Sequence, residues 1–238
     1  MTSGPDARLR TGEHPTSTLD FLLRPAKWLV GRKWPITLHG QEHVPASGPV
    51  ILASNHVGLI DGPLLAVLGP RPVHALTKQE MFDSRASGVL RRSGQIRLDR
   101  DTADPAAVKA CIRVLDAGEV VGIFPEGTRG DGEFGRIHRG AAYLALVSGA
   151  PVVPVAMFGT RAPGARNHAM PPKGGSIDVV YGEPWQVAAQ PWPRTREHVG
   201  ATSALLHQHL RTALDRARDL TGRDLPGPLP GQETTDAP

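Results

Sequence analysis

The stretch PVILASNHVGLIDGP, residues 49–63, determines how the rest of this sequence is interpreted. Its first part, residues 49–53, is a short apolar run that ends at polar residues, which is typical of a strand in a buried sheet. Pro63 disfavours helical geometry in the residue before it and fits best in the first turn of a helix. The stretch therefore predicts a core strand, a polar turn that contains His56, and a helix capped by Asp61.

His56 and Asp61 have the chemistry of a general base and the acid that orients it. In a regular helix, side chains five positions apart point about 140° away from each other, but across a turn between strand and helix they can meet. The carboxylate would then accept a hydrogen bond from one ring nitrogen and leave the other free to remove a proton. The alternative from these residues alone is a helix cap next to a polar turn residue.

A second stretch, GIFPEGTR at residues 122–129, extends the pattern. A glycine-led segment that ends in arginine, GQIRLDR at 94–100, precedes it, and a Val-Pro-Val segment at 153–155 follows. Together with the Asn-His-x4-Asp block, these segments resemble the 1-acylglycerol-3-phosphate acyltransferase family in both sequence and order. The resemblance covers roughly residues 38–185.

The resemblance implies that His56 and Asp61 are the catalytic pair. It also implies that Lys78 and Arg100 hold the phosphate of the acceptor, because guanidinium and ammonium groups bind phosphate oxygens. Without the family, Lys78 is better interpreted as a solvated lysine after a strand. One departure from the family is Gly58, where relatives commonly carry serine.

The loop that begins in the second stretch adds candidates for substrate binding. Gly127 permits close approach of the backbone, Thr128 supplies a hydroxyl, and Arg129 supplies positive charge. A carboxylate repels phosphate, so we expect Glu126 either to orient an arginine or to accept a hydrogen bond from the glycerol hydroxyl.

Arg139 completes the predicted substrate-binding residues. Many relatives of the family have a lysine where His138 stands in this sequence. If that lysine assists anion binding, either Arg139 takes over its role or the imidazole makes the role depend on pH.

The expected fold class is α/β, a single domain with a mixed, mostly parallel central sheet flanked by helices. The expected strands cover residues 36–40, 49–53, 73–77, 120–124, 151–156 and 177–181, and residues 93–100 are expected to form a turn and a strand that ends at Arg100. Helices are expected at 62–68, 104–118, 140–149 and 195–220. Because ligands of open α/β sheets bind at the carboxyl ends of the strands, the loops with His56 and Glu126 should open on one edge.

The function implied by the resemblance is transfer of an acyl group from acyl-CoA or acyl carrier protein to the sn-2 hydroxyl of lysophosphatidic acid, giving phosphatidic acid. No metal or prosthetic group is expected. One alternative is an acyltransferase for a different lysolipid or polar-lipid acceptor, and another is a non-catalytic lipid-binding protein of the same fold. A serine hydrolase is disfavoured because the Gly-x-Ser-x-Gly elbow is absent from the sequence.

Composition agrees with one domain and sets limits on partners. The chain has 238 residues, a formal net charge of +4 and one cysteine, Cys111, which excludes an internal disulfide framework. The basic residues are spread along the sequence without a nucleic-acid-binding motif. The charge balance therefore favours anionic lipid or a phosphorylated substrate over nucleic acid.

The chain divides into four expected regions. Residues 1–17 are polar and are expected to be disordered, and 18–35 form an amphipathic segment of Leu, Trp, Arg and Lys. This segment either lies on an anionic membrane surface or packs on the enzyme itself. Residues 36–222 form the acyltransferase domain, and 223–238 are expected to be a disordered tail. The absence of a signal peptide or a membrane-spanning apolar run predicts a peripheral or monotopic protein on the cytoplasmic face.

Overall fold

A computed structural model describes residues 27–84, 86–100 and 104–231. It contains one sheet of seven strands in the order β1-β7-β6-β2-β5-β3-β4. The strands are β1 (Ile36–His39), β2 (Val50–Ser54), β3 (Val73–Lys78), β4 (Ile96–Leu98), β5 (Val120–Ile123), β6 (Val152–Phe158) and β7 (Ile177–Tyr181). The pair β6–β7 is antiparallel and the other pairs are parallel. The predicted mixed, mostly parallel α/β sheet is therefore confirmed.

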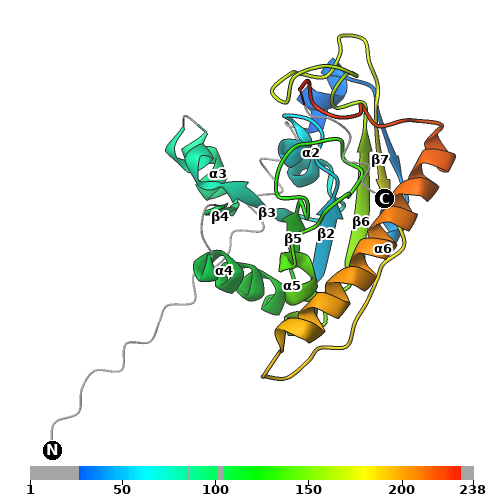
Figure 1. The fold of residues 1–238 in the computed structure, drawn as a ribbon. Coiled ribbons are helices and arrows are strands. Elements are labelled where there is room, and N and C mark those ends of the chain that lie inside the picture. The colour runs from blue at the N-terminus through cyan, green and yellow to red at the C-terminus, as the bar shows by residue number, and fades with distance from the viewer. Residues whose placement is uncertain (1–26, 85, 101–103, 232–238) are drawn as a thin grey trace, which may run out of the picture.

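Helices lie on both faces of this sheet. The α-helices are α2 (Asp61–Leu68), α3 (Ser87–Arg92), α4 (Pro105–Asp116), α5 (Gly140–Ser148) and α6 (Arg196–Thr221), and the short 3-10 helices are η1 (Gln41–His43) and η2 (Gln79–Asp83). Figure 1 shows α4, α5 and α6 gathered on one side of the sheet, with α6 running alongside β6 and β7. Residues 27–33 are also helical.

Alternation along the central strands explains why both faces are covered. In β2, Ile51 and Ala53 pack in the core cluster with α4, α5 and α6, whereas Val50 and Leu52 pack in the cluster with α2. Successive side chains of a strand point to opposite faces of the sheet, so a strand that is apolar throughout must be covered on both. All five residues of β2 are buried, which places its last residue and the turn that follows at the centre of the molecule.

The predicted cap of α4 is confirmed, whereas the predicted cap of α2 is not. In α4, the side chain of Asp104 accepts a hydrogen bond from the backbone N–H of Ala107, and proline occupies the first turn, as predicted. In α2, the predicted cap is wrong: Asp61 is the first helical residue, and its carboxylate bonds back to the turn before the helix.

Cys111 on α4 is a packed apolar residue, as the sequence indicated. It is buried in the core cluster together with Leu115 of the same helix. Burial raises the pKa of its thiol to about 12, so the reactive thiolate is scarce at neutral pH.

The region between β3 and β4 is more structured than the sequence indicates. The turn and strand predicted at 93–100 contain β4, which is three residues long and lies at the edge of the sheet. The helices η2 and α3, which were not predicted, precede it. Segments of five or six residues are too short to show a hydrophobic period, so their helical turns leave no clear pattern in the sequence.

The structure describes neither the first 26 residues nor the last seven, so only part of each terminal region can be compared with the prediction. Residues 1–17, and 18–26 of the amphipathic segment, lie outside the described residues. Of the tail predicted to be disordered, 223–238, residues 232–238 also lie outside the described residues. Residues 223–231 differ from the expectation, because Arg223 forms an ion pair of 2.9 Å with Asp178 and Leu225 packs on the main core. Proline and glycine content suggested disorder, but a few long-range contacts order the backbone here. No helix in the described part of the chain is long and apolar enough to cross a bilayer.

Candidate active site

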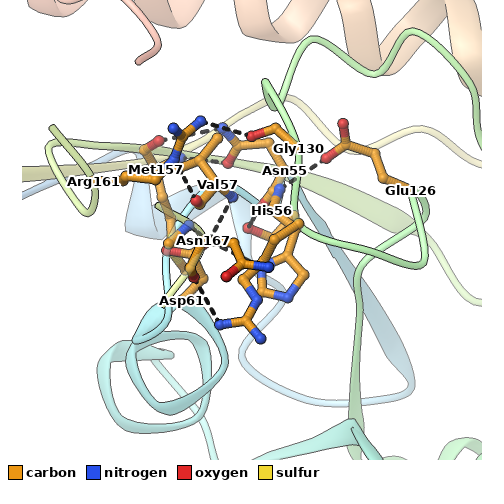
Figure 2. Close-up of polar contacts among 12 residues, drawn as sticks. Asn55, His56, Val57, Asp61, Glu126, Gly130, Met157, Arg161 and Asn167 are labelled. Atoms are coloured by element: carbon orange, nitrogen blue, oxygen red, sulfur yellow. Dashed lines mark hydrogen bonds and ion pairs between the residues drawn. The ribbon is translucent and has the colours of Figure 1, made fainter. Parts of the chain in front are cut away.

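The turn after β2 brings His56 and Asp61 together as predicted. Nδ1 of His56 lies 3.0 Å from Oδ2 of Asp61, and the same oxygen accepts hydrogen bonds from the backbone N–H groups of Val57 and Gly58, each at 2.7 Å. Asp61 is fully buried at the start of α2, and His56 is 8% exposed. Figure 2 shows the bonds that join this carboxylate to the turn. One carboxylate oxygen therefore fixes both the fold of the turn and the orientation of the imidazole.

This geometry leaves the other ring nitrogen of His56 available for chemistry. Because Asp61 accepts at Nδ1, the neutral ring carries its proton there, and Nε2 presents a lone pair. The ring is stacked on Phe124 at the end of β5, with 4.1 Å between ring centroids and 25° between planes. The stack and the hydrogen bond together hold the imidazole in one orientation.

Glu126 makes a contact that we did not predict. Its Oε2 accepts a hydrogen bond of 2.8 Å from the backbone N–H of His56. Burial raises the pKa of the Glu126 carboxyl to about 8, and the hydrogen bond from His56 and one from the backbone of Phe134 oppose this shift. Glu126 thus connects the loop after β5 to the turn after β2 by a hydrogen bond to the backbone of His56.

The loop after Glu126 contacts the His56 turn a second time. The backbone N–H of Gly130 donates to the carbonyl of His56 at 2.9 Å. Gly127 has a φ of 72°, and a Cβ at this position would lie 2.7 Å from the ring of His138. Gly127 therefore permits a close approach, but the group that approaches it in the structure is the histidine ring. Thr128 is exposed beside it.

The cations predicted after β3, β4 and β5 lie close enough to interact electrostatically with one another or with Glu80. Lys78 forms an ion pair of 2.5 Å with Glu80. The pKa of Arg100 is lowered by burial and by the like charge of Arg129, and Glu80 opposes this. Arg129 also donates to the backbone carbonyl of Asn167 at 2.9 Å. Two guanidinium groups that repel each other favour the binding of an anion between them.

Arg139 is not brought to this group. It precedes α5, and its guanidinium lies beside Gly200 in the early part of α6, 3.9 Å from where a Cβ on that glycine would be. Its position gives no support to the predicted anion-binding role.

Two residues that were not predicted from the sequence stabilise the His56 turn through hydrogen bonds between their side chains and the backbone. The side-chain amide of Asn55 pairs with the backbone of Met157 in β6, accepting at 2.8 Å and donating at 3.2 Å. Arg161, which follows β6, donates to the carbonyl of Val57 at 2.8 Å. Figure 2 shows both side chains around the turn. Asn55 had a signal in the sequence, since it precedes His56 in the family block, whereas Arg161 had none.

The described residues contain no group of three or more His, Cys, Asp or Glu side chains that could hold a metal ion. Two histidines of α6 contact backbone oxygens instead. Nε2 of His207 contacts the carbonyl of Phe134, and Nε2 of His209 contacts the carbonyl of Glu183 at 2.9 Å.

The fold and this site place a histidine-aspartate pair, a geometry suited to general-base chemistry, at the carboxyl edge of an α/β sheet. The model of the Acyltransferase family matches residues 35–158, and the chain belongs to this family.

Among curated proteins, a 1-acyl-sn-glycerol-3-phosphate acyltransferase of Bacillus subtilis is 29% identical over 193 residues, which cover 80% of this chain and 94% of the relative. A protein of the same name from Borreliella burgdorferi is 33% identical over 138 residues, or 56% of this chain and 54% of the relative. Among solved structures, the 1-acyl-sn-glycerophosphate (LPA) acyltransferase PlsC of Thermotoga maritima has a TM-score of 0.58 at 22% identity. That match covers 87% of this chain and 80% of the other. The structural likeness supports the fold.

Proposed function

We propose that this protein transfers a fatty acyl group from a thioester donor to the sn-2 hydroxyl of lysophosphatidic acid, giving phosphatidic acid for phospholipid synthesis. The names of the Bacillus subtilis and Borreliella burgdorferi relatives support this reaction. The observation that carries the proposal is the 3.0 Å contact between Nδ1 of His56 and the buried Asp61. It provides a base at the same edge of the sheet as the cations that follow β3, β4 and β5.

The reaction follows from the orientation of the imidazole. Nε2 of His56 removes the proton of the sn-2 hydroxyl as its oxygen attacks the thioester carbonyl. The new carbon–oxygen bond forms, the carbon–sulfur bond breaks, and the imidazolium returns the proton to the departing thiolate. Asp61 stays ionised throughout and stabilises the imidazolium, as the acid of a catalytic triad does. No acyl-enzyme intermediate is needed, because the hydroxyl attacks the donor directly.

The cations position the acceptor. Lys78, Arg100 and Arg129 hold the phosphate, so that the adjacent glycerol hydroxyl lies near His56. Holding two reactants in the reactive geometry contributes several kcal/mol to catalysis, up to roughly 10 kcal/mol. A phosphate also relieves the mutual repulsion of Arg100 and Arg129.

The donor is acyl-CoA or acyl carrier protein, since both present the same thioester. The chemistry assigned to His56 and Asp61 needs the donor as co-substrate and no metal or prosthetic group.

The acceptor and product are membrane lipids, and we propose that the protein acts as a peripheral or monotopic enzyme on the cytoplasmic face. In the helical residues 27–33, Trp28 is 62% and Leu29 is 59% exposed, and the guanidinium of Arg32 lies 5.4 Å from the centroid of the Trp28 ring. Exposed tryptophan and leucine next to cations suit a surface of anionic lipid. Trp34 at the end of this segment is buried and donates to the carbonyl of Pro172 at 3.2 Å, so part of the segment packs on the enzyme itself.

One assay tests the proposal. The full chain is incubated with labelled acyl-CoA or acyl carrier protein and a panel of lysolipids that differ in headgroup, and the products are separated by headgroup. We expect phosphatidic acid as the main product and less than about 1% of the rate from His56→Ala, which removes the base. Preferred use of another lysolipid would favour the alternative acceptor. No transfer to any acceptor, together with binding of anionic vesicles, would favour a lipid-binding protein.

A further inference from the structure

Arg161 is a buried arginine that joins four separate segments of the chain. It is 2% exposed and lies three residues after the end of β6. Nε donates to the carbonyl of Val57 at 2.8 Å and Nη1 to that of Ala165 at 2.9 Å. Nη2 donates to the carbonyls of Gly130 at 2.9 Å and Gly227 at 2.6 Å. All four acceptors are backbone oxygens.

A guanidinium buried in this way is costly unless its surroundings offset the charge. Burial lowers the pKa of Arg161, and the carboxylates of Asp61 and Asp131 act in the opposite direction. Within the described residues, Oδ1 of Asp61 is buried without a hydrogen-bond partner. The nearby positive charge of Arg161 partly offsets the cost of burying this carboxylate. Arg161 thus complements both the carbonyls that it contacts and the acid of the catalytic pair.

The contact with Val57 completes the fixation of the catalytic turn. The N–H of Val57 donates to Asp61, and its carbonyl accepts from Arg161, so the residue next to His56 is held at both ends. The contact with Gly130 does the same for the second loop, because the N–H of Gly130 donates to the carbonyl of His56. One side chain therefore connects the two loops of the active site, as Figure 2 shows.

The fourth acceptor lies beyond α6, in residues 223–231. The carbonyl of Gly227 receives the shortest of the four bonds. Leu225 packs close to Gly132, where any side chain would collide with Val57. The segment is anchored at its start by the ion pair of Arg223 with Asp178. The segment therefore extends to the active-site region, where the carbonyl of Gly227 contacts Arg161.

We infer that Arg161 is a positioning residue for the acyl transfer, and that residues 223–231 serve the active site by supplying one of its anchors. All four hydrogen bonds of Arg161 go to backbone carbonyls, so it acts through the backbone of the turn and the loop that hold His56. This inference rests on the proposed function for its kinetic readout. A displacement of the base by about 1 Å lowers the rate on the order of 100-fold.

The experiment compares variants of the full chain. Arg161→Ala removes the guanidinium, and Arg161→Lys keeps the charge but offers a single nitrogen, which cannot reach four carbonyls. A stop after Gly222 removes residues 223–238, and a stop after Gly231 is the matched control that removes only 232–238. Arg223→Ala separates the ion pair with Asp178 from the contact at Gly227.

The measurements are kcat and KM for both substrates, circular dichroism with thermal unfolding, and amide hydrogen exchange of Val57 and Gly58. For Arg161→Ala we expect a folded protein with kcat about 100-fold lower, KM within about threefold, and faster exchange at both amides. Added guanidinium ion at millimolar concentration should restore part of kcat, and Arg161→Lys should not exceed about a tenth of wild-type kcat. The stop after Gly222 should resemble Arg161→Ala, and the stop after Gly231 should resemble wild type. Arg223→Ala loses only the ion pair at the start of the segment, so its kcat should fall between these two.

Three outcomes overturn the inference. If Arg161→Ala keeps the kcat of wild type, the guanidinium has no positioning role. A loss of activity that equals the unfolded fraction, without rescue by guanidinium, makes Arg161 a stability residue only. Full activity after the stop at Gly222 removes the role of the C-terminal segment. If wild-type protein transfers no acyl group, the proposed function fails, but the exchange of the Val57 and Gly58 amides still decides whether Arg161 holds the turn.

Discussion

Replacement of Glu126 by Gln should change how the stability of the protein depends on pH. Burial raises the pKa of this carboxyl from 4.5 to about 8 in the folded protein. Between these two values the folded protein holds a proton that the unfolded chain has lost. The free energy of unfolding must therefore fall as the pH rises through this window, by about 1.4 kcal/mol per pH unit from this group.

The size of the effect follows from the width of the window. If the shift is taken as about two to three and a half pH units, this carboxyl removes about 3 to 5 kcal/mol of stability between pH 4.5 and 8. Glutamine keeps an oxygen that accepts the 2.8 Å bond from the backbone of His56, but it cannot ionise. Glu126→Gln should therefore lack this loss of stability and be more stable than wild type at pH 8.

Urea unfolding of both proteins at intervals between about pH 4.5 and 8.5 measures this difference directly. We expect the free energies to converge near pH 4.5 and to separate steadily above it. Glu126→Ala is the control, because it leaves the His56 N–H without its acceptor and should cost about 1 to 3 kcal/mol at low pH, where the wild-type carboxyl is protonated. A difference between wild type and Glu126→Gln that is constant with pH would refute the argument, because it would mean that the carboxyl titrates at its ordinary pKa.

Three further substitutions test other contacts. Asp61→Asn keeps an oxygen for the turn but removes the charge that stabilises the imidazolium of His56, so kcat should fall about 1,000- to 10,000-fold in steady-state assays; a fall below about tenfold would contradict its role. Arg100→Ala should raise KM for a phosphorylated acceptor roughly tenfold and leave an acceptor without phosphate unaffected, and equal losses on both would count against phosphate binding. Gly58→Ala places a Cβ 2.7 Å from the carbonyl oxygen of Thr160 and should destabilise the fold by about 1 to 3 kcal/mol on thermal unfolding, so unchanged stability would show that the turn can shift.

The features that the sequence predicted correctly are those set by local pattern. Apolar runs identified the central strands, and Asp104 with the proline after it marked the start of α4. The polar turn at His56 lies after a fully buried strand, so its place at the carboxyl edge of the sheet followed from the same pattern. The meeting of His56 with Asp61 was predictable because the two are separated by one short turn.

The features that could not be predicted depend on contacts between distant segments. Arg161 donates only to backbone carbonyls, and every residue has a carbonyl, so no residue type reveals its partners. The bond from the backbone of His56 to Glu126 joins residues 70 positions apart and likewise uses a main-chain group. The position of Arg139 could not be predicted from the sequence, because the residues around it depend on how α5 packs against α6.

In the proposed mechanism, the order of the strands places proton transfer and recognition of the acceptor in different parts of the sheet. The base and its acid lie close together in the chain after the central strand β2, whereas Lys78 and Arg100 follow β3 and β4 toward one margin of the sheet. Substitutions in the outer loops can therefore alter the headgroup that is accepted while the proton-transfer apparatus stays intact. An arrangement of this kind allows one scaffold to diversify across lipid classes, and it gives protein engineers a defined region in which to redesign selectivity.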